Sequence, residues 1–130
     1  MNQYSYNTNV ESLFATSFVE STLDQIMVIR KNHKQNFKEV IHQALIGRKV
    51  VAKYNKGKTY MIGGVRWDKN PKTTFPDVQI EDRDISFAQY FKNTYGLEIE
   101  DLEQPMISGM LNDGVNVHFL LVPELCFPSF

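Results

Sequence analysis

A single helical pattern interrupts the strand-like second half of this sequence. Residues 86–96 place apolar side chains at helical spacing, whereas the runs on either side, within residues 49–75 and 105–121, are short and strand-like. A parallel α/β sheet requires helices that alternate with strands, and one isolated helix cannot supply that alternation. We therefore expect an α+β fold that is mainly β, a small, partly open barrel with an inserted α/β appendage.

Two further helices precede the strands. Ser21 or Thr22 can cap the first helix, which we expect to end near residues 32–33. Asn36 is the candidate cap of the second helix, and Gly47 closes it. The apolar stripe of the second helix consists of Phe37, Val40, Ile41, Ala44 and Leu45.

Four strand-like runs are separated by turn-forming residues. They are Val50–Tyr54, Tyr60–Trp67, Pro105–Met110 and Val117–Leu121. Residues 55–58 join the first two runs in a hairpin with a basic tip, and residues 112–114 are the turn between the last two. Residues 76–84 predict a short irregular hairpin, and residues 11–19 indicate a buried strand. Residues 123–130 either close the barrel or are cut from a longer chain.

The third helix has the clearest local signals. Ser86 and Gln89 predict a capping box, and Gly96 ends the helix. Its apolar stripe consists of Phe87, Tyr90, Phe91, Thr94 and Tyr95. Tyr90 and Tyr95 are five positions apart, which separates them by about 140° around the helix axis. One helix face therefore cannot bury both tyrosines equally.

Length and composition predict one domain over residues 1–130, with residues 1–10 flexible. No run approaches the roughly 18 apolar residues of a membrane span. The polar start of the chain does not resemble a signal peptide, and the single cysteine, Cys126, cannot form an internal disulfide. We expect a monomer without a membrane anchor, in the cytoplasm or nucleus.

The charge of the chain is balanced in sum and uneven in distribution. Fourteen basic and fifteen acidic side chains nearly cancel, which argues against a general nucleic-acid coat. Residues 30–58 contain nine basic side chains and one acidic side chain, whereas residues 77–103 contain eight acidic side chains and two basic ones. The basic segment can form a local site for an anionic ligand. Alternatively, both charged segments are only solvent-exposed surfaces.

Nothing in the sequence predicts catalysis, a metal site or a cofactor. The three histidines and Cys126 lack the short spacings of zinc ligands. No Gly-x-Ser-x-Gly turn, Gly-rich phosphate loop or His-Glu-x-x-His helix is present. The carboxylates of residues 98–103 lie in a polar run that indicates a solvated loop.

Aromatic side chains recur around the predicted appendage. They are Tyr54, Tyr60, Phe75, Phe87, Tyr90, Phe91 and Tyr95. Aromatic faces stack on unpaired bases, and tyrosine hydroxyls bind phosphate. The alternative is that each ring belongs only to the hydrophobic core.

The run Gly64–Phe75 resembles the Trp-Asp-x-Asn-Pro-x-x-Thr-Phe signature of PAZ domains from Piwi-clade Argonaute proteins. Further segments are similar to that family in the same order. They are Leu45–Gly47, Lys53–Asn55, Lys58–Tyr60, Asp84–Phe87, Gln89–Phe91 with Tyr95, Gln104–Pro105 and Val122–Cys126. The resemblance spans about residues 22–126.

This resemblance implies an OB-like barrel with a hairpin-helix appendage, here residues 72–104. Barrel and appendage form a clamp around the last two nucleotides of a single-stranded guide RNA. The implied partners are the 3′ end of a small RNA and the other domains of a parent Argonaute protein. The Piwi clade further implies a preference for a 2′-O-methylated end, since burying a methyl group gains roughly 0.8 kcal/mol.

The resemblance also assigns roles to individual residues. Tyr60, Tyr90 and Tyr95 match the tyrosines that hold the terminal phosphodiester. Phe75 matches the aromatic that stacks on the terminal base, and Lys58 matches a basic backbone contact. Either Lys53 or Tyr54 stands where many Argonautes have a phosphate-binding histidine, and Leu120, Leu121 and Val122 stand at the apolar wall of the pocket.

Two other functions remain open from the sequence. One is a PAZ domain of a Dicer-like nuclease, which would prefer a 2′-hydroxyl end. The other is a protein-interaction module that keeps the fold without binding RNA.

Overall fold

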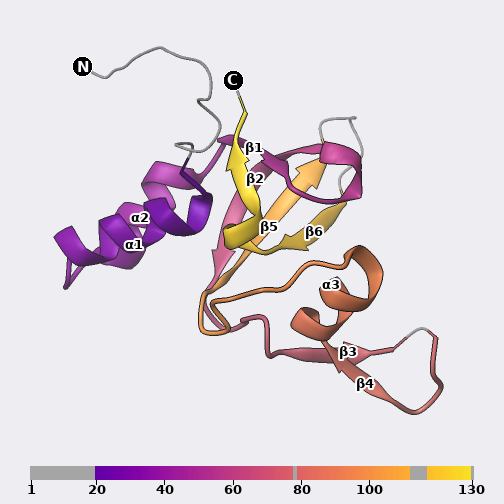
Figure 1. Cartoon of the computed structure of the whole chain (residues 1–130). Coiled ribbons are helices and arrows are strands. Elements are labelled where there is room, and N and C mark those ends of the chain that lie inside the picture. Colours follow the sequence, from indigo (N-terminus) through magenta and orange to yellow (C-terminus); the bar gives the residue numbers. More distant parts are fainter. Residues whose placement is uncertain (1–19, 78, 112–116, 130) are drawn as a thin grey trace.

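The computed structural model describes residues 20–77, 79–111 and 117–129 (Figure 1). The helices are α1 (Thr22–Asn32), α2 (Phe37–Leu45) and α3 (Phe87–Tyr95), with short 3-10 turns η2 (Asn55–Gly57) and η3 (Pro123–Leu125). The strands are β1 (Lys49–Ala52), β2 (Thr59–Arg66), β3 (Thr74–Pro76), β4 (Asp84–Ser86), β5 (Met106–Leu111), β6 (His118–Leu121) and β7 (Cys126–Pro128). The predictions for residues 1–19 and 112–114 lie outside the described residues.

Local capping explains where α1 begins. The Ser21 hydroxyl accepts a hydrogen bond from the Asp24 amide at 3.1 Å, and the Asp24 carboxylate accepts one from the Ser21 amide at 3.0 Å. The buried Thr22 hydroxyl donates to the Cys126 carbonyl at 3.0 Å. The start of α1 is therefore tied to β7, at the other end of the chain.

The second helix confirms the predicted stripe but not its cap. Ile41 and Leu45 are buried, and α2 packs against α1 and β2. Asn36 occupies the N-cap position, yet its side chain makes no capping hydrogen bond. Gly47 follows the helix with φ 81°, a backbone conformation that glycine adopts without strain.

Five antiparallel strands form an open sheet in the order β6-β5-β2-β1-β7. The predicted α+β, mainly β architecture is confirmed, and its larger sheet is antiparallel and is not a closed barrel. The predicted strand Val50–Tyr54 ends early, at Ala52, because Asn55 and Lys56 adopt left-handed φ angles of 53° and 61°. β7 pairs with β1 and forms an edge, so residues 126–128 extend the sheet and do not close a barrel.

The appendage consists of the β3-β4 hairpin and α3, inserted between β2 and β5 and set apart from α1 and α2 (Figure 1). The Ser86 hydroxyl accepts from the Gln89 amide at 3.1 Å. The Gln89 side chain, however, bonds Asn93 at 2.7 Å, so only half of the predicted capping box forms. Gly96, with φ 68°, ends α3 as predicted.

A polar network fixes the segment that returns from the appendage to the sheet. The Glu124 carboxylate accepts from the backbone amides of Glu100 and Asp101, both at 2.9 Å, and from the Gln104 side chain at 3.0 Å. The Glu124 amide donates back to the Gln104 side-chain oxygen at 2.9 Å. Since Gln104 is buried, this network clamps the return segment against η3.

We expect Glu124→Ala to lower the free energy of unfolding by about 2 kcal/mol, because three donors lose a charged acceptor. Glu124→Gln keeps one acceptor oxygen and should lose less. The matched control is Glu98→Ala, whose pair with Lys92 is exposed and 3.6 Å long, and which should change stability by less than about 0.5 kcal/mol. Urea denaturation measures all three; equal effects of Glu124→Ala and Glu98→Ala would contradict this account of the network.

Candidate nucleic-acid interface

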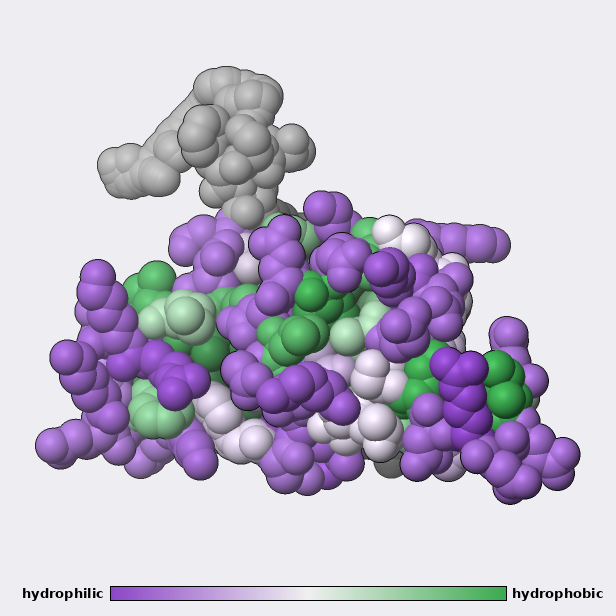
Figure 2. All heavy atoms as spheres, turned by 60° about the horizontal axis from the view of Figure 1, so that its bottom comes forward, coloured by the Kyte–Doolittle hydropathy of each residue, from purple (hydrophilic) through white to green (hydrophobic). Residues whose placement is uncertain are grey.

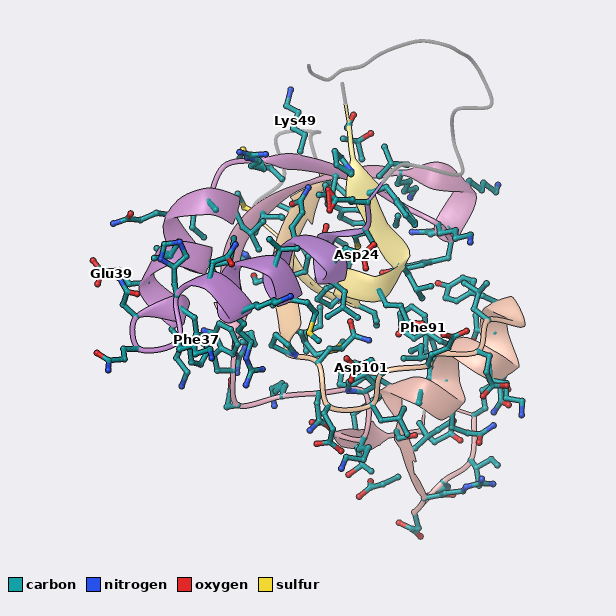
Figure 3. The ribbon with its side chains drawn as sticks, turned by 60° about the vertical axis from the view of Figure 1, so that its left-hand side comes forward. Asp24, Phe37, Glu39, Lys49, Phe91 and Asp101 are labelled. Atoms are coloured by element: carbon teal, nitrogen blue, oxygen red, sulfur yellow. The ribbon has the colours of Figure 1, made fainter. Side chains whose placement is uncertain are left out.

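Aromatic rings join the sheet to the appendage. Tyr54, just after β1, packs edge-on against Phe91 of α3, with ring centroids 4.8 Å apart, and lies 5.0 Å from the Tyr95 ring. Figure 3 shows Phe91 where α3 faces the sheet. Tyr54 and Phe91 are both buried, so this contact is part of the core.

Tyr60 enters the same region from β2. It is 2% exposed, and its ring centroid lies 5.8 Å from that of Phe119 on β6. A Cβ atom at Gly109 on β5 would lie 3.2 Å from the Tyr60 Cβ and 2.6 Å from Leu121 Cδ1. Gly109 therefore leaves the space in which Tyr60 and Leu121 pack.

The two tyrosines of α3 contact the buried Phe91 and each other. Its ring centroid is 5.9 Å from that of Tyr90 and 5.5 Å from that of Tyr95. Tyr90 and Tyr95 are themselves 6.2 Å apart and both half-buried. Although Tyr90 and Tyr95 are five positions apart and point in different directions around the helix axis, their rings are in edge contact.

Phe75 extends the cluster onto the hairpin. Its ring centroid lies 4.7 Å from that of Phe87 and 5.6 Å from that of Tyr90. A hollow of about 200 Å³ beside Phe75 and Tyr90 also reaches Ile85 and Thr94. A larger hollow of about 470 Å³ lies elsewhere, between α1 and residues 101–105, and includes none of the predicted RNA-binding residues.

The tyrosine hydroxyls are proton donors in this environment. Burial raises the pKa of Tyr54 far above its usual range, with smaller contributions from Cys126, Tyr60 and Tyr95. Burial also raises the pKa of Tyr95, with the neighbouring Tyr90 as the next cause. Both phenols therefore stay protonated at neutral pH, and the half-buried Tyr95 can donate to an anion.

The Tyr54 hydroxyl is buried and has no hydrogen-bond partner among the described residues. The Val122 backbone opposes the pKa shift of Tyr54 but does not complete a hydrogen bond with it. An unpaired buried hydroxyl costs about 1–3 kcal/mol. The structure therefore carries a local cost at this position.

Tyr54 and Lys53, the two candidates for the position of the phosphate-binding histidine, have different surroundings. Tyr54 lies in the aromatic cluster, whereas Lys53 is exposed and its Nζ lies 6.0 Å from the Phe127 ring centroid. Lys58 is exposed beside the η2 turn. The cluster thus contains Tyr54 and not Lys53.

The predicted apolar wall is mostly core. Leu121 and Val122 are fully buried, whereas Leu120 is half-buried. A ligand can meet Leu120 directly, but it can reach the other two only if their neighbours move. Contact between RNA and these residues stays a prediction.

Sequence reasoning missed two neighbours of Tyr60. Phe119 is 38% exposed and packs edge-on against Tyr60, and Asn55 donates from Nδ2 to the Tyr60 hydroxyl at 3.1 Å. The alternation of Phe119 with Leu121 along β6 could have indicated that both lie on the inner face. No sequence signal points to the side-chain bond of Asn55.

The described residues show no other chemical centre. No group of three or more His, Cys, Asp or Glu side chains gathers among them as a metal site. Burial raises the pKa of the Cys126 thiol to about 12, so it is not a thiolate at neutral pH. Within the same residues, no helix has the length and apolar character needed to cross a membrane.

Comparison with known families identifies the domain. The sequence matches the PAZ domain family over residues 23–130. The chain belongs to the PAZ domain family. Its aromatic cluster thus lies where a PAZ sheet meets its appendage.

Curated relatives of this PAZ domain include Piwi-like proteins. It is 36% identical to Piwi-like protein 1 of Danio rerio over 118 residues, which covers 83% of this chain and 13% of that protein. It is 28% identical to the Piwi-like protein Siwi of Bombyx mori over 113 residues, 83% of this chain and 12% of that protein. The chain therefore spans about an eighth of the length of these relatives.

Solved structures share the PAZ fold. The crystal structure of Drosophila Piwi is similar with a TM-score of 0.58 and 28% identity, over 84% of this chain and 12% of that one. Dicer from Giardia intestinalis has a TM-score of 0.65 but only 13% identity, over 89% of this chain and 15% of that one. The likeness to Dicer extends to the fold alone.

We expect Tyr54→Phe to raise the free energy of unfolding by about 1 kcal/mol, because it removes an unpaired buried hydroxyl. The raised pKa adds a pH signature: above pH 10 the unfolded chain releases this proton while the folded chain keeps it, so wild-type stability falls as pH rises. The variant should fall less steeply. Thermal and urea unfolding at pH 7 and pH 10.5 measure both effects. The control is Tyr90→Phe, since Tyr90 is only half-buried. Destabilisation by Tyr54→Phe at pH 7 would mean that the Tyr54 hydroxyl has a hydrogen-bond partner.

Proposed function

We propose that this PAZ domain binds the 3′ end of a single-stranded small RNA, without reading its sequence, as part of a Piwi-type silencing protein. The observation that carries the proposal is the convergence of tyrosines from the sheet and the appendage on one cluster. Tyr54 and Tyr60 come from the sheet side, and Tyr90 and Tyr95 come from α3. Such a cluster suits a chain end, which is recognised by shape, stacking and phosphate contact.

The phosphodiester would be held by neutral donors. Tyr60, Tyr90 and Tyr95 are the proposed contacts to the terminal phosphate, with the exposed Lys58 supplying a positive charge. Tyr90 and Tyr95 are half-buried, whereas Tyr60 is 2% exposed, so the phosphate meets its hydroxyl only when neighbouring side chains move. Phenolic O–H groups bind phosphate oxygens without a positive patch. A net charge of −1 is therefore compatible with the proposal.

The terminal nucleotide would lie against the hairpin. Phe75 is half-buried, and its contacts to Phe87 and Tyr90 hold its ring in place. A base stacked on an aromatic side chain gains about 1–3 kcal/mol. The proposed contact for a 2′-O-methyl group is the predicted apolar wall, in which Leu121 shares a sheet face with Tyr60 and the half-buried Leu120 points to the opposite face.

The two alternatives receive less support. The Dicer likeness rests on 13% identity, whereas Piwi proteins reach 36%. The face shown in Figure 2 carries separate apolar patches between hydrophilic side chains, without the broad apolar surface of many stable protein interfaces. The proposed role is binding and not catalysis, in a monomeric module joined to other Argonaute domains, in the cytoplasm or nucleus.

The test is the affinity of the chain for one short single-stranded RNA with three different termini. We expect a 2′-O-methyl end to bind a few-fold tighter than a 2′-hydroxyl end, as one buried methyl is worth roughly 0.8 kcal/mol. A 3′-phosphate should weaken binding strongly, because it adds charge and bulk at a closed end. Fluorescence anisotropy with end-labelled RNA gives all three dissociation constants.

Two variants complete this test. Tyr95→Phe should cost on the order of 1 kcal/mol of binding, the value of one hydrogen bond. Lys34→Ala, an exposed charge after α1, is the control for non-specific attraction and should change the affinities for all three ends by the same small factor. Equal binding to all three ends would refute end recognition, and a preference for the 2′-hydroxyl would favour the Dicer-like alternative.

A further inference from the structure

The turn between β1 and β2 carries an unusual backbone. Asn55, Lys56 and Gly57 have φ angles of 53°, 61° and 68°, three left-handed residues in succession. Asparagine tolerates this conformation better than most side chains. The Gly57 amide donates to the Tyr54 carbonyl at 3.1 Å, which closes the turn and fixes the position of Asn55.

The side chain of Asn55 reaches into the aromatic cluster. Its Nδ2 donates to the Tyr60 hydroxyl oxygen at 3.1 Å, although the two residues lie on opposite sides of the turn. Asn55 is half-buried and Tyr60 is 2% exposed, so water competes weakly for this bond. The bond therefore determines how the hydroxyl of Tyr60 is oriented.

The direction of this hydrogen bond matters. A phenol has one proton and can accept at its lone pairs. Because the Tyr60 oxygen accepts from Asn55, its own proton is directed toward another acceptor. Burial is the largest cause of the raised pKa of Tyr54 and of Tyr95, so both side chains keep their protons at neutral pH. The cluster is thus rich in donors, and an anionic ligand would supply the acceptor.

We propose that Asn55 is a positioning residue that orients the Tyr60 hydroxyl to donate its proton to a non-bridging oxygen of the terminal phosphodiester. The inference rests on the proposed function and adds that Asn55 sets the orientation of one hydrogen-bond donor, the Tyr60 hydroxyl. Accepting a hydrogen bond from Asn55 also makes the Tyr60 hydroxyl a stronger donor. A carboxylate at this position would act in the opposite way, since it can only accept and would take the proton itself.

The test is a double-mutant cycle between Asn55 and Tyr60. Asn55→Gly keeps the left-handed backbone accessible and removes the side chain. We expect it to weaken RNA binding about fivefold, the equivalent of one hydrogen bond. In the Tyr60→Phe background the same change should have no further effect. Asn55→Asp, nearly the same shape, should weaken binding more than Asn55→Gly, and the difference should persist at high salt.

A second measurement separates positioning from general loosening of the turn. Lys56→Gly introduces glycine at the next left-handed position without touching Tyr60; its effect should come from the lost charge and disappear at high salt. An RNA whose terminal linkage is a neutral methylphosphonate should bind wild type and Asn55→Gly with nearly equal affinity. These two results would locate the effect of Asn55 at the phosphodiester.

The outcomes distinguish this inference from the proposed function. If Tyr60→Phe weakens binding while Asn55→Gly has no effect, or has the same effect in both backgrounds, the inference is wrong and the proposed function stands. If wild type binds blocked and free 3′ ends equally, the proposed function fails and the inference fails with it.

Discussion

The packing of Tyr54 against Phe91 and Tyr95 is the contact on which the arrangement of the two lobes depends. The appendage leaves the sheet after β2 and returns at β5, so its covalent connections alone would allow it to move. The aromatic contact holds α3 against the sheet on one side, and the Glu124–Gln104 network clamps the return segment on the other. Together they place Tyr60 and the tyrosines of α3 in one cluster.

The same contact has a cost in stability. Packing Tyr54 between aromatic rings buries its hydroxyl without a partner, and burial is the largest cause of its raised pKa. Unsatisfied buried groups are few in native proteins. A cluster of protonated phenols with few internal acceptors is chemically suited to an anion. At Tyr54 this cost falls on stability, whereas the proposed phosphate contacts are made by other tyrosines of the cluster.

Much of the fold could be predicted because its signals are local. The stripes and end signals of α1, α2 and α3 depend on near neighbours in sequence, and all three helices form where expected. The features that sequence analysis did not predict depend on competing hydrogen-bond partners or on contacts between residues far apart in the sequence. Gln89 bonds Asn93 in preference to completing the capping box, and β7 becomes an edge because β1 offers it a partner. The burial of Leu121 and Val122 depends on strands far away in sequence. The bond from Asn55 to Tyr60 depends on three left-handed residues that no hydrophobic pattern indicates.

The central claim is that the end of an RNA chain, and not its interior, lies between the appendage and the sheet. Photo-crosslinking tests it directly, with 4-thiouridine placed either at the last nucleotide or five nucleotides away and the crosslinked peptides mapped by mass spectrometry. The account predicts that the terminal probe reacts within residues 74–95 or at Tyr60, while the internal probe does not. Crosslinks from the terminal probe to α1 and α2, or the same pattern from both probes, would contradict it.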